Sequence, residues 1–126
     1  MQAGKYDFVM EQGAVFDENV YWILDTGIPK NITGYSAKMS IRQTVNSVAA
    51  IFSLYTTPTP GCGTITITGS SGKVRLYANA DLTRALSFTS AVYDLELASD
   101  GTDPHTSDYA VRLLEGKITF SKEVTK

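Results

Sequence analysis

The segment "YSAKMSIR" (residues 35–42) alternates between apolar and polar side chains. Its odd positions, from Tyr35 to Ile41, are apolar, and its even positions, from Ser36 to Arg42, are polar. Successive side chains of a β-strand point to opposite faces of the sheet. The segment therefore predicts a strand that buries one face and exposes the other.

The same period of two recurs along most of the chain. In "AVYDLELA" (residues 91–98) it predicts that Leu95 and its apolar neighbours point inward, whereas Asp94 and Glu96 point outward. Turn signals separate such runs at short intervals. The pattern predicts eight short strands, over residues 6–10, 14–25, 35–42, 48–56, 64–68, 73–78, 91–98 and 109–121.

Local signals interrupt the strands at three places. "GSSG" (residues 69–72) is typical of a tight hairpin turn, and the two prolines of "TPTPGCG" (residues 57–63) break regular structure. "NADLTRAL" (residues 79–86) predicts the only helix, about two turns long, with Asn79 as its N-cap. Asp81 lies where the helix dipole favours a negative charge.

Many short strands without alternating helices favour one all-β domain over residues 1–126. We expect an antiparallel, immunoglobulin-like β-sandwich with one short helix. A bulge is expected near Gly116 in the last strand, where the apolar pattern changes phase. The polar loop over residues 99–108 is longer than a hairpin needs, and binding sites often lie in such loops.

Composition narrows the classes of function. The net charge is −2, from 11 basic and 13 acidic residues, which is too balanced for a typical nucleic-acid or anionic-membrane partner. Cys62 is the only cysteine, so no intrachain disulfide is expected, as in proteins made in a reducing cytoplasm. The start, "MQAGKYDF", lacks the pattern of a secretory signal, and no apolar run approaches the ~20 residues that span a bilayer.

The 99–108 loop holds the only histidine, His105. A Ser-His-Asp triad could be drawn with Ser99 or Ser107. Such a triad needs a fixed third group and an oxyanion site, and loop spacing alone supplies neither. We therefore expect a solvated polar loop without catalytic residues.

Metal binding is the second chemistry that this loop suggests. Asp100, Asp103 and Asp108 provide oxygen ligands, but Ca²⁺ requires six to eight of them and the EF-hand spacing is absent. One histidine and the distant Cys62 do not form a zinc cluster. We expect no metal and no cofactor. Cys62 itself lies among glycines, without a nearby cation or helix N-terminus to activate the thiol.

Two neighbouring aromatic residues, Tyr21 and Trp22, are predicted to point to opposite faces of one strand. An outward aromatic ring could stack on a sugar or fill a pocket of a partner. The more common outcome is that both rings lie in or near the core. The tripeptide "NIT" (residues 31–33) matches the glycosylation sequon, but it is a frequent match and carries little weight here.

Four longer segments resemble a known family in the same order along the chain. They are "YDFVMEQGAVFDENVYW" (6–22), "ITGYSAKMSIRQ" (32–43), "GTITITGSSGKVRLYANADLTRAL" (63–86) and "YDLELASDGT…VRLLEGKITFSKEVT" (93–125). The family consists of small β-sandwich virion proteins of tailed bacteriophages. It includes the tail collar protein that anchors long side tail fibres in some siphophages. "TGY.A.M.IR" and "YDLEL…RLLEG" are the most specific segments.

The resemblance implies a β-sandwich that assembles in a ring or hub, without catalytic residues or cofactors. The implied partners are copies of itself and other phage tail or fibre proteins. The implied location is the virion tail, after synthesis in the bacterial host cytoplasm. The chain departs from the family pattern at "PTPGCG" (58–63) and at "DPHTSD" (103–108), which resembles an insertion.

Three functions follow as hypotheses. The first is a tail collar or connector subunit. The second is a receptor- or glycan-binding module of a baseplate or fibre, or a minor structural protein of the head, and the third is a hydrolase. The last strand has few charges in its middle and is predicted to be an unprotected sheet edge. With the tail "KEVTK" (122–126), this edge favours a closed head-to-tail ring. The candidate protein-contact residues are Tyr21, Trp22, Asp100, Asp103, His105, Asp108, Lys122 and Glu123.

Overall fold

The computed structural model describes residues 3–124 and consists mostly of β-strands. The only α-helix in this part of the chain is α1 (Ala80–Arg84), and a 3₁₀ turn, η1, spans Gly69–Ser71. The prediction of an all-β protein with one short helix is confirmed. The strands are β1 (Gly4–Lys5), β2 (Phe8–Glu11), β3 (Phe16–Tyr21), β4 (Ser36–Arg42), β5 (Phe52–Tyr55), β6 (Gly63–Thr68), β7 (Lys73–Ala78), β8 (Ser90–Ala98) and β9 (Ala110–Ser121).

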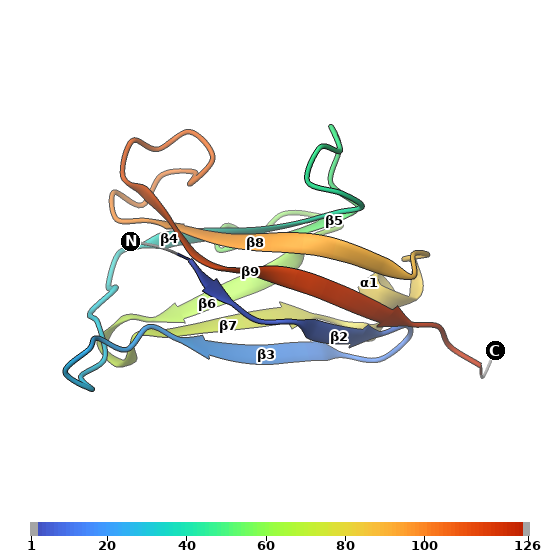
Figure 1. Cartoon of the computed structure of the whole chain (residues 1–126), viewed down its shortest axis with the longest axis horizontal. Helices are drawn as coiled ribbons and strands as arrows, with labels where there is room; N and C mark the ends of the chain where they lie inside the picture. The colour runs from blue at the N-terminus through green and yellow to red at the C-terminus, as the bar shows by residue number, and fades with distance from the viewer. Residues whose placement is uncertain (1–2, 125–126) are drawn as a thin grey trace.

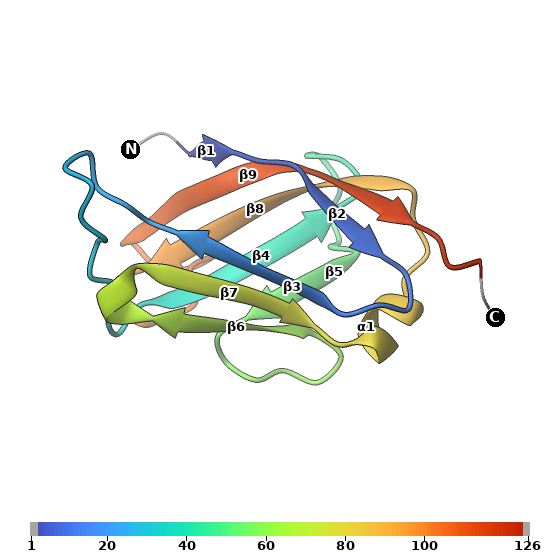
Figure 2. The same cartoon turned by 90° about the horizontal axis from the view of Figure 1, so that it is seen from below.

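The strands form one mixed, curled sheet in the order β1-β9-β8-β4-β5-β6-β7-β3, and β2 continues the pairing of β1 along β9. The curl places β3, β7 and β6 opposite β9, β8 and β4, so that the sheet encloses its own core (Figures 1 and 2). Among residues 3–124, the open edges of the sheet are β3 and the β1–β2 segment.

The predicted all-antiparallel arrangement is wrong, because three strand pairs are parallel. β1 and β2 both run parallel to β9, and β5 runs parallel to β6. The β2–β9 pairing brings Phe8 opposite Ile118 and places Phe8 and Met10 in the core. Burial of these two side chains stabilises the N-terminal segment in its position along the otherwise unpaired side of β9.

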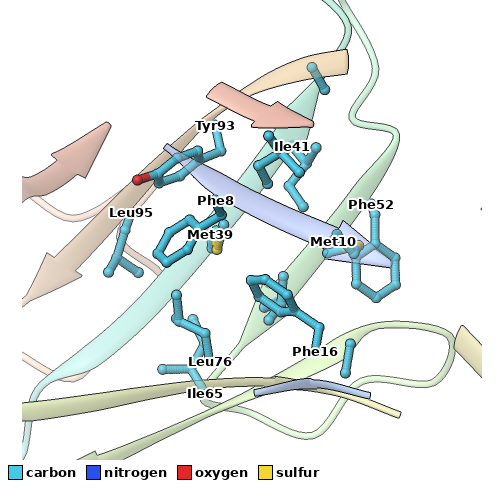
Figure 3. Close-up of a cluster of buried hydrophobic side chains, with 14 of the residues drawn as sticks. Phe8, Met10, Phe16, Met39, Ile41, Phe52, Ile65, Leu76, Tyr93 and Leu95 are labelled. Atoms are coloured by element: carbon cyan, nitrogen blue, oxygen red, sulfur yellow. The ribbon is translucent and has the colours of Figure 1, made fainter. Parts of the chain in front are cut away.

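The core lies between the two halves of the curled sheet. Figure 3 shows side chains from both halves meeting there. Phe8 contacts three other rings, with centroids 4.9 Å from Tyr6, 5.7 Å from Phe16 and 5.2 Å from Tyr93. The alternation predicted for residues 35–42 and 91–98 is confirmed within β4 and β8, because their predicted inward side chains are buried, whereas Tyr35 precedes β4 and is partly buried. Those of 0% exposure in these strands are Met39, Ile41, Leu95 and Leu97.

The last strand differs from its prediction in two ways. β9 is not a sheet edge, because β8 pairs with one side and β1 and β2 with most of the other. Its bulge lies at Leu113, where the register against β8 shifts between Leu95 and Glu96. Gly116 has a different role, since a β-carbon there would overlap the Tyr6 carbonyl oxygen as the chain passes from β1 to β2.

The turn and the helix lie where they were predicted, but α1 has 5 residues and is shorter than the predicted 79–86 segment. Two short strands, β1 and β2, take the place of the predicted 6–10 strand, and two other strands are shorter than predicted. Asn79 caps α1, with its side chain accepting a 2.9 Å hydrogen bond from the Leu82 amide. The turn over residues 69–72 joins β6 and β7 as a hairpin. β3 ends at Tyr21, however, and β5 starts only at Phe52.

Candidate binding pocket between two loops

Two loops that are far apart in the sequence meet at one end of β4 and β5. The first follows β5 over residues 56–62, and the second joins β8 to β9 over residues 99–109. A pocket of about 240 Å³ lies between them. Its lining residues are Ser36, Ala37, Tyr55, Thr56, Thr57, Thr59, Gly101, Thr102, Asp103 and Pro104.

Hydrogen bonds within the 99–109 loop fix its shape. Asp100 Oδ1 accepts hydrogen bonds from Thr102 Oγ1 at 2.8 Å and from Ser107 Oγ at 2.9 Å. Partial desolvation tends to raise the pKa of Asp100, but these hydrogen bonds outweigh it and lower the pKa below its ordinary value. The Ser36 hydroxyl on β4 donates to the Thr102 carbonyl, which ties the loop to the sheet.

Asp103 organises the second half of the loop. Its Oδ1 accepts a 2.9 Å hydrogen bond from the His105 amide, and its carbonyl oxygen accepts 3.0 Å bonds from the amides of Thr106 and Ser107. Pro104 is buried beneath the loop, whereas Asp103 and His105 are exposed. These hydrogen bonds hold the backbone of Asp103 in place, so its carboxylate is presented to the pocket from a fixed position.

The opposite wall comes from β5 and the residues after it. Leu54 points into the core, so Tyr55 points outward and its ring lies 5.3 Å from the Lys38 Nζ on β4. The Thr56 hydroxyl bonds the backbone of Ala37. Three side-chain polar groups of the lining have no hydrogen-bond partner among residues 3–124, namely Tyr55 Oη, Thr57 Oγ1 and Asp103 Oδ2.

The structure does not assemble the triad or the metal site considered for this loop. The His105 ring makes no hydrogen bond to Ser99 or Ser107 within the described chain, and Ser107 Oγ is bonded to Asp100 instead. No group of three His, Cys, Asp or Glu side chains that could hold a metal ion occurs among residues 3–124. Asp108 is exposed and does not line the pocket.

The two aromatic residues of the N-terminal half lie in a different region. Tyr21 is 53% exposed, whereas Trp22 is partly buried and packs edge-to-face on Tyr35, as expected for opposite faces. The segment 22–30 then forms an arm, closed by hydrogen bonds between Trp22 and Lys30 and between Leu24 and Ile28. The exposed apolar side chains of β3 and this arm are Tyr21, Ile23, Leu24 and Ile28.

Lys122 and Glu123 lie at a third place, beside α1 and the β2–β3 turn. The Glu123 amide donates to Gln12 Oε1 at 2.9 Å, and its carboxylate lies 3.8 Å from the Arg84 Nε. Lys122 is exposed. The arm and the 99–109 loop lie at one end of the molecule and the C-terminal segment at the other (Figure 1). The eight candidate residues therefore form three separate surfaces.

Sequence reasoning named Asp103 but missed the residues that complete its pocket. Tyr55, Thr57 and Ser36 belong to segments predicted as strands or breaks, not as binding residues. One signal was available for Tyr55, because in "FSLY" the inward Leu54 requires its neighbour to face outward beside the proline-rich segment.

Comparison of the chain with known protein families and with curated proteins finds no match. Within residues 3–124, the one α-helix is too short to cross a bilayer.

Proposed function

We propose that the chain is a non-enzymatic structural protein of a tailed-phage virion. In this proposal it is an oligomeric collar or connector subunit of the tail that anchors fibres or neighbouring tail proteins. The observation that carries the proposal is the resemblance described above, which extends over nearly the whole chain in the same order. The structure supports the proposal because the two most specific segments contain residues that are buried in the core or glycines that the backbone requires.

The positions in those segments have clear physical roles. "TGY.A.M.IR" contains Gly34, whose φ of +83° favours glycine, and the buried Met39 and Ile41 of β4. "YDLEL…RLLEG" contains the buried Leu95 of β8 and Gly116, against which the Tyr6 carbonyl packs. A shared fold would restrict such positions, which is why their agreement supports a family relationship.

The proposal extends to the finer description of the fold. We propose that the curled sheet is a variant of the immunoglobulin-like β-sandwich, with β3, β7 and β6 as one layer and β4, β8 and β9 as the other. The short parallel pairing of β5 with β6 then joins the two layers at one side.

The proposed ring requires a contact surface other than β9, which is paired on both sides. The arm over residues 22–30 supplies one, because Ile28 is 62% exposed and Ile23 and Leu24 are each more than 40% exposed. It follows β3, which is an open sheet edge. An apolar projection beside an open edge suits a head-to-tail contact between identical copies.

Particles provide the decisive test. Quantitative mass spectrometry and imaging of purified virions should find several copies per tail, in a symmetric layer that carries fibres. The Ile28→Asp variant should enter virions poorly, whereas Val48→Asp, at a 98% exposed position outside the arm, should enter normally. Absence from virions, a single copy, or one trimer at a fibre tip would contradict the proposal.

A further inference from the structure

The pocket between the two loops combines the two segments that depart from the family pattern. "PTPGCG" (58–63) and "DPHTSD" (103–108) lie about forty-five positions apart, yet Thr59 from the first and Asp103 and Pro104 from the second line one pocket. We propose that this pocket binds one residue of a neutral sugar. This inference goes beyond the collar function, and the contacts that carry it are those of the pocket itself.

The pocket offers one aromatic surface for a sugar ring. Tyr55 presents an apolar ring ending in a hydroxyl, a combination that suits a ligand with apolar C–H faces and polar edges. Its partly buried position between Lys38 and the loop restricts its movement. A ring held in this way loses little side-chain entropy when a ligand packs on it.

The free polar groups match the hydroxyls of a sugar. Asp103 Oδ2 only accepts hydrogen bonds, whereas the hydroxyls of Tyr55 and Thr57 both donate and accept. Sugar hydroxyls also donate and accept, so neighbouring hydroxyls can bond a carboxylate and a threonine together. The remaining lining hydroxyls, of Ser36, Thr56, Thr59 and Thr102, already have protein acceptors, which keeps the walls in place.

Charge and size restrict the ligand further. Asp103 is the only charged side chain of the lining, because Lys38 lies against the Tyr55 ring but outside the lining, so phosphates, uronic acids and sialic acids are disfavoured. The volume of about 240 Å³ is smaller than the roughly 300–1,000 Å³ of pockets for drug-sized ligands. One sugar ring is therefore the appropriate size, and a single site would bind it weakly.

Two-dimensional ¹H–¹⁵N NMR with methyl glycosides tests the proposal. Methyl glycosides of glucose, galactose, mannose, N-acetylglucosamine and rhamnose are titrated into the protein up to tens of millimolar, since a single weak site has a Kd of about 1 mM or above. At least one should give saturable shifts at residues 55–59 and 101–104. Galacturonate should bind at least about fivefold more weakly than methyl galactoside, and equal binding would contradict the neutral-ligand assignment.

Two variants with matched controls locate the site. Asp103→Asn keeps the Oδ1 acceptor but removes the charge, and it should weaken binding at least about fivefold. Asp108→Asn, in the same loop but outside the pocket, should have no effect. Tyr55→Ala should abolish saturation, whereas Tyr109→Ala, at a 65% exposed position at the end of the loop and outside the pocket, should not. If Tyr55→Ala fails to fold, the Asp103 and Asp108 pair decides alone.

A polymer distinguishes two sources of the sugar. Shifts at the same residues with dextran assign the ligand to a polysaccharide, and shifts with methyl glycosides alone assign it to a free or terminal sugar. Either result supports the proposal. No saturable shift with any probe, or binding unaffected by Asp103→Asn, overturns it. If the pocket variants instead reduce the copy number in virions, the pocket is a protein contact, and the sugar proposal fails while the collar proposal stands.

Discussion

Replacing Gly116 with alanine should destabilise the protein by crowding the crossing between the N-terminal segment and β9. A β-carbon at this position would overlap the Tyr6 carbonyl oxygen and lie 2.8 Å from the Tyr6 carbonyl carbon. Because these are backbone atoms, a side-chain rotation cannot relieve the overlap. The chain between β1 and β2 must move away from β9.

That movement would disturb three hydrogen bonds at the crossing. They run from Tyr93 Oη to the Tyr6 carbonyl at 2.6 Å, from the Tyr6 amide to the Glu115 carbonyl at 3.0 Å, and from the Lys117 amide to Asp7 Oδ1 at 2.9 Å. Overpacking costs about 1–3 kcal/mol and each weakened hydrogen bond about 0.5–1.5 kcal/mol, while the lost flexibility of glycine returns about 0.5–1 kcal/mol. The expected net loss is about 1.5 kcal/mol if each destabilising effect is at its minimum and the glycine term at its maximum, and about 7 kcal/mol in the opposite case with all three bonds lost.

Equilibrium unfolding in urea measures this loss, and Gly4→Ala is the matched control. A β-carbon at Gly4 would meet Leu114 Cδ1 at 3.4 Å and the Leu113 carbonyl at 3.6 Å, which are ordinary contacts. This control should change the unfolding free energy by no more than about 0.5 kcal/mol. Equal stability of the two variants, or normal hydrogen-exchange protection of residues 118–121 in Gly116→Ala, would refute the reasoning.

Three further predictions concern the core, the helix cap and pH. Leu95→Ala should destabilise the protein by about 2–5 kcal/mol in urea unfolding, and Glu96→Ala on the outer face by at most about 0.5 kcal/mol; equal losses would mean that the faces are reversed. Asn79→Ala should reduce stability by about 1 kcal/mol through loss of the cap, and a neutral result would show that the cap contributes nothing. Burial, with Asp7 nearby, raises the pKa of Tyr93 well above its ordinary value. The stabilisation linked to this shift should persist below about pH 10 and decline at higher pH, less steeply in Tyr93→Phe.

Local alternation was sufficient to predict the strands that bury one complete face. β4 and β8 follow this rule along most of their length, but Ser36 and Ala98, predicted to face outward, are buried where the two strands pair beside the 99–109 loop. The 14–25 strand was predicted too long, because its apolar residues continue beyond Tyr21. Ile23 instead bridges Pro29 within the arm, where Gly27 takes a φ of +86° to make the turn. A strand and a short extended arm have the same local pattern.

The alternation of apolar and polar residues does not show which strands pair when they lie far apart in the sequence. The alternation in residues 8–11 shows that Phe8 and Met10 face a core, but not that their strand lies parallel to residues 118–121. The candidate pocket was missed for the same reason. Asp103 was visible in its loop, whereas its position opposite Tyr55 depends on how β4, β5 and β8 are ordered in the sheet.

The parallel pairing of β2 with β9 also determines when folding can finish. Residues 8–11 must wait for residues 118–121 to be synthesised, and this separation gives the protein a high contact order. β-rich domains with such distant contacts fold in roughly milliseconds to seconds. Until then, Phe8 and Met10 remain outside the core and one side of β9 has no partner. A chain that has not yet formed this pairing, more than the finished protein, is therefore the form in which a second copy could exchange its β2 strand or begin to aggregate.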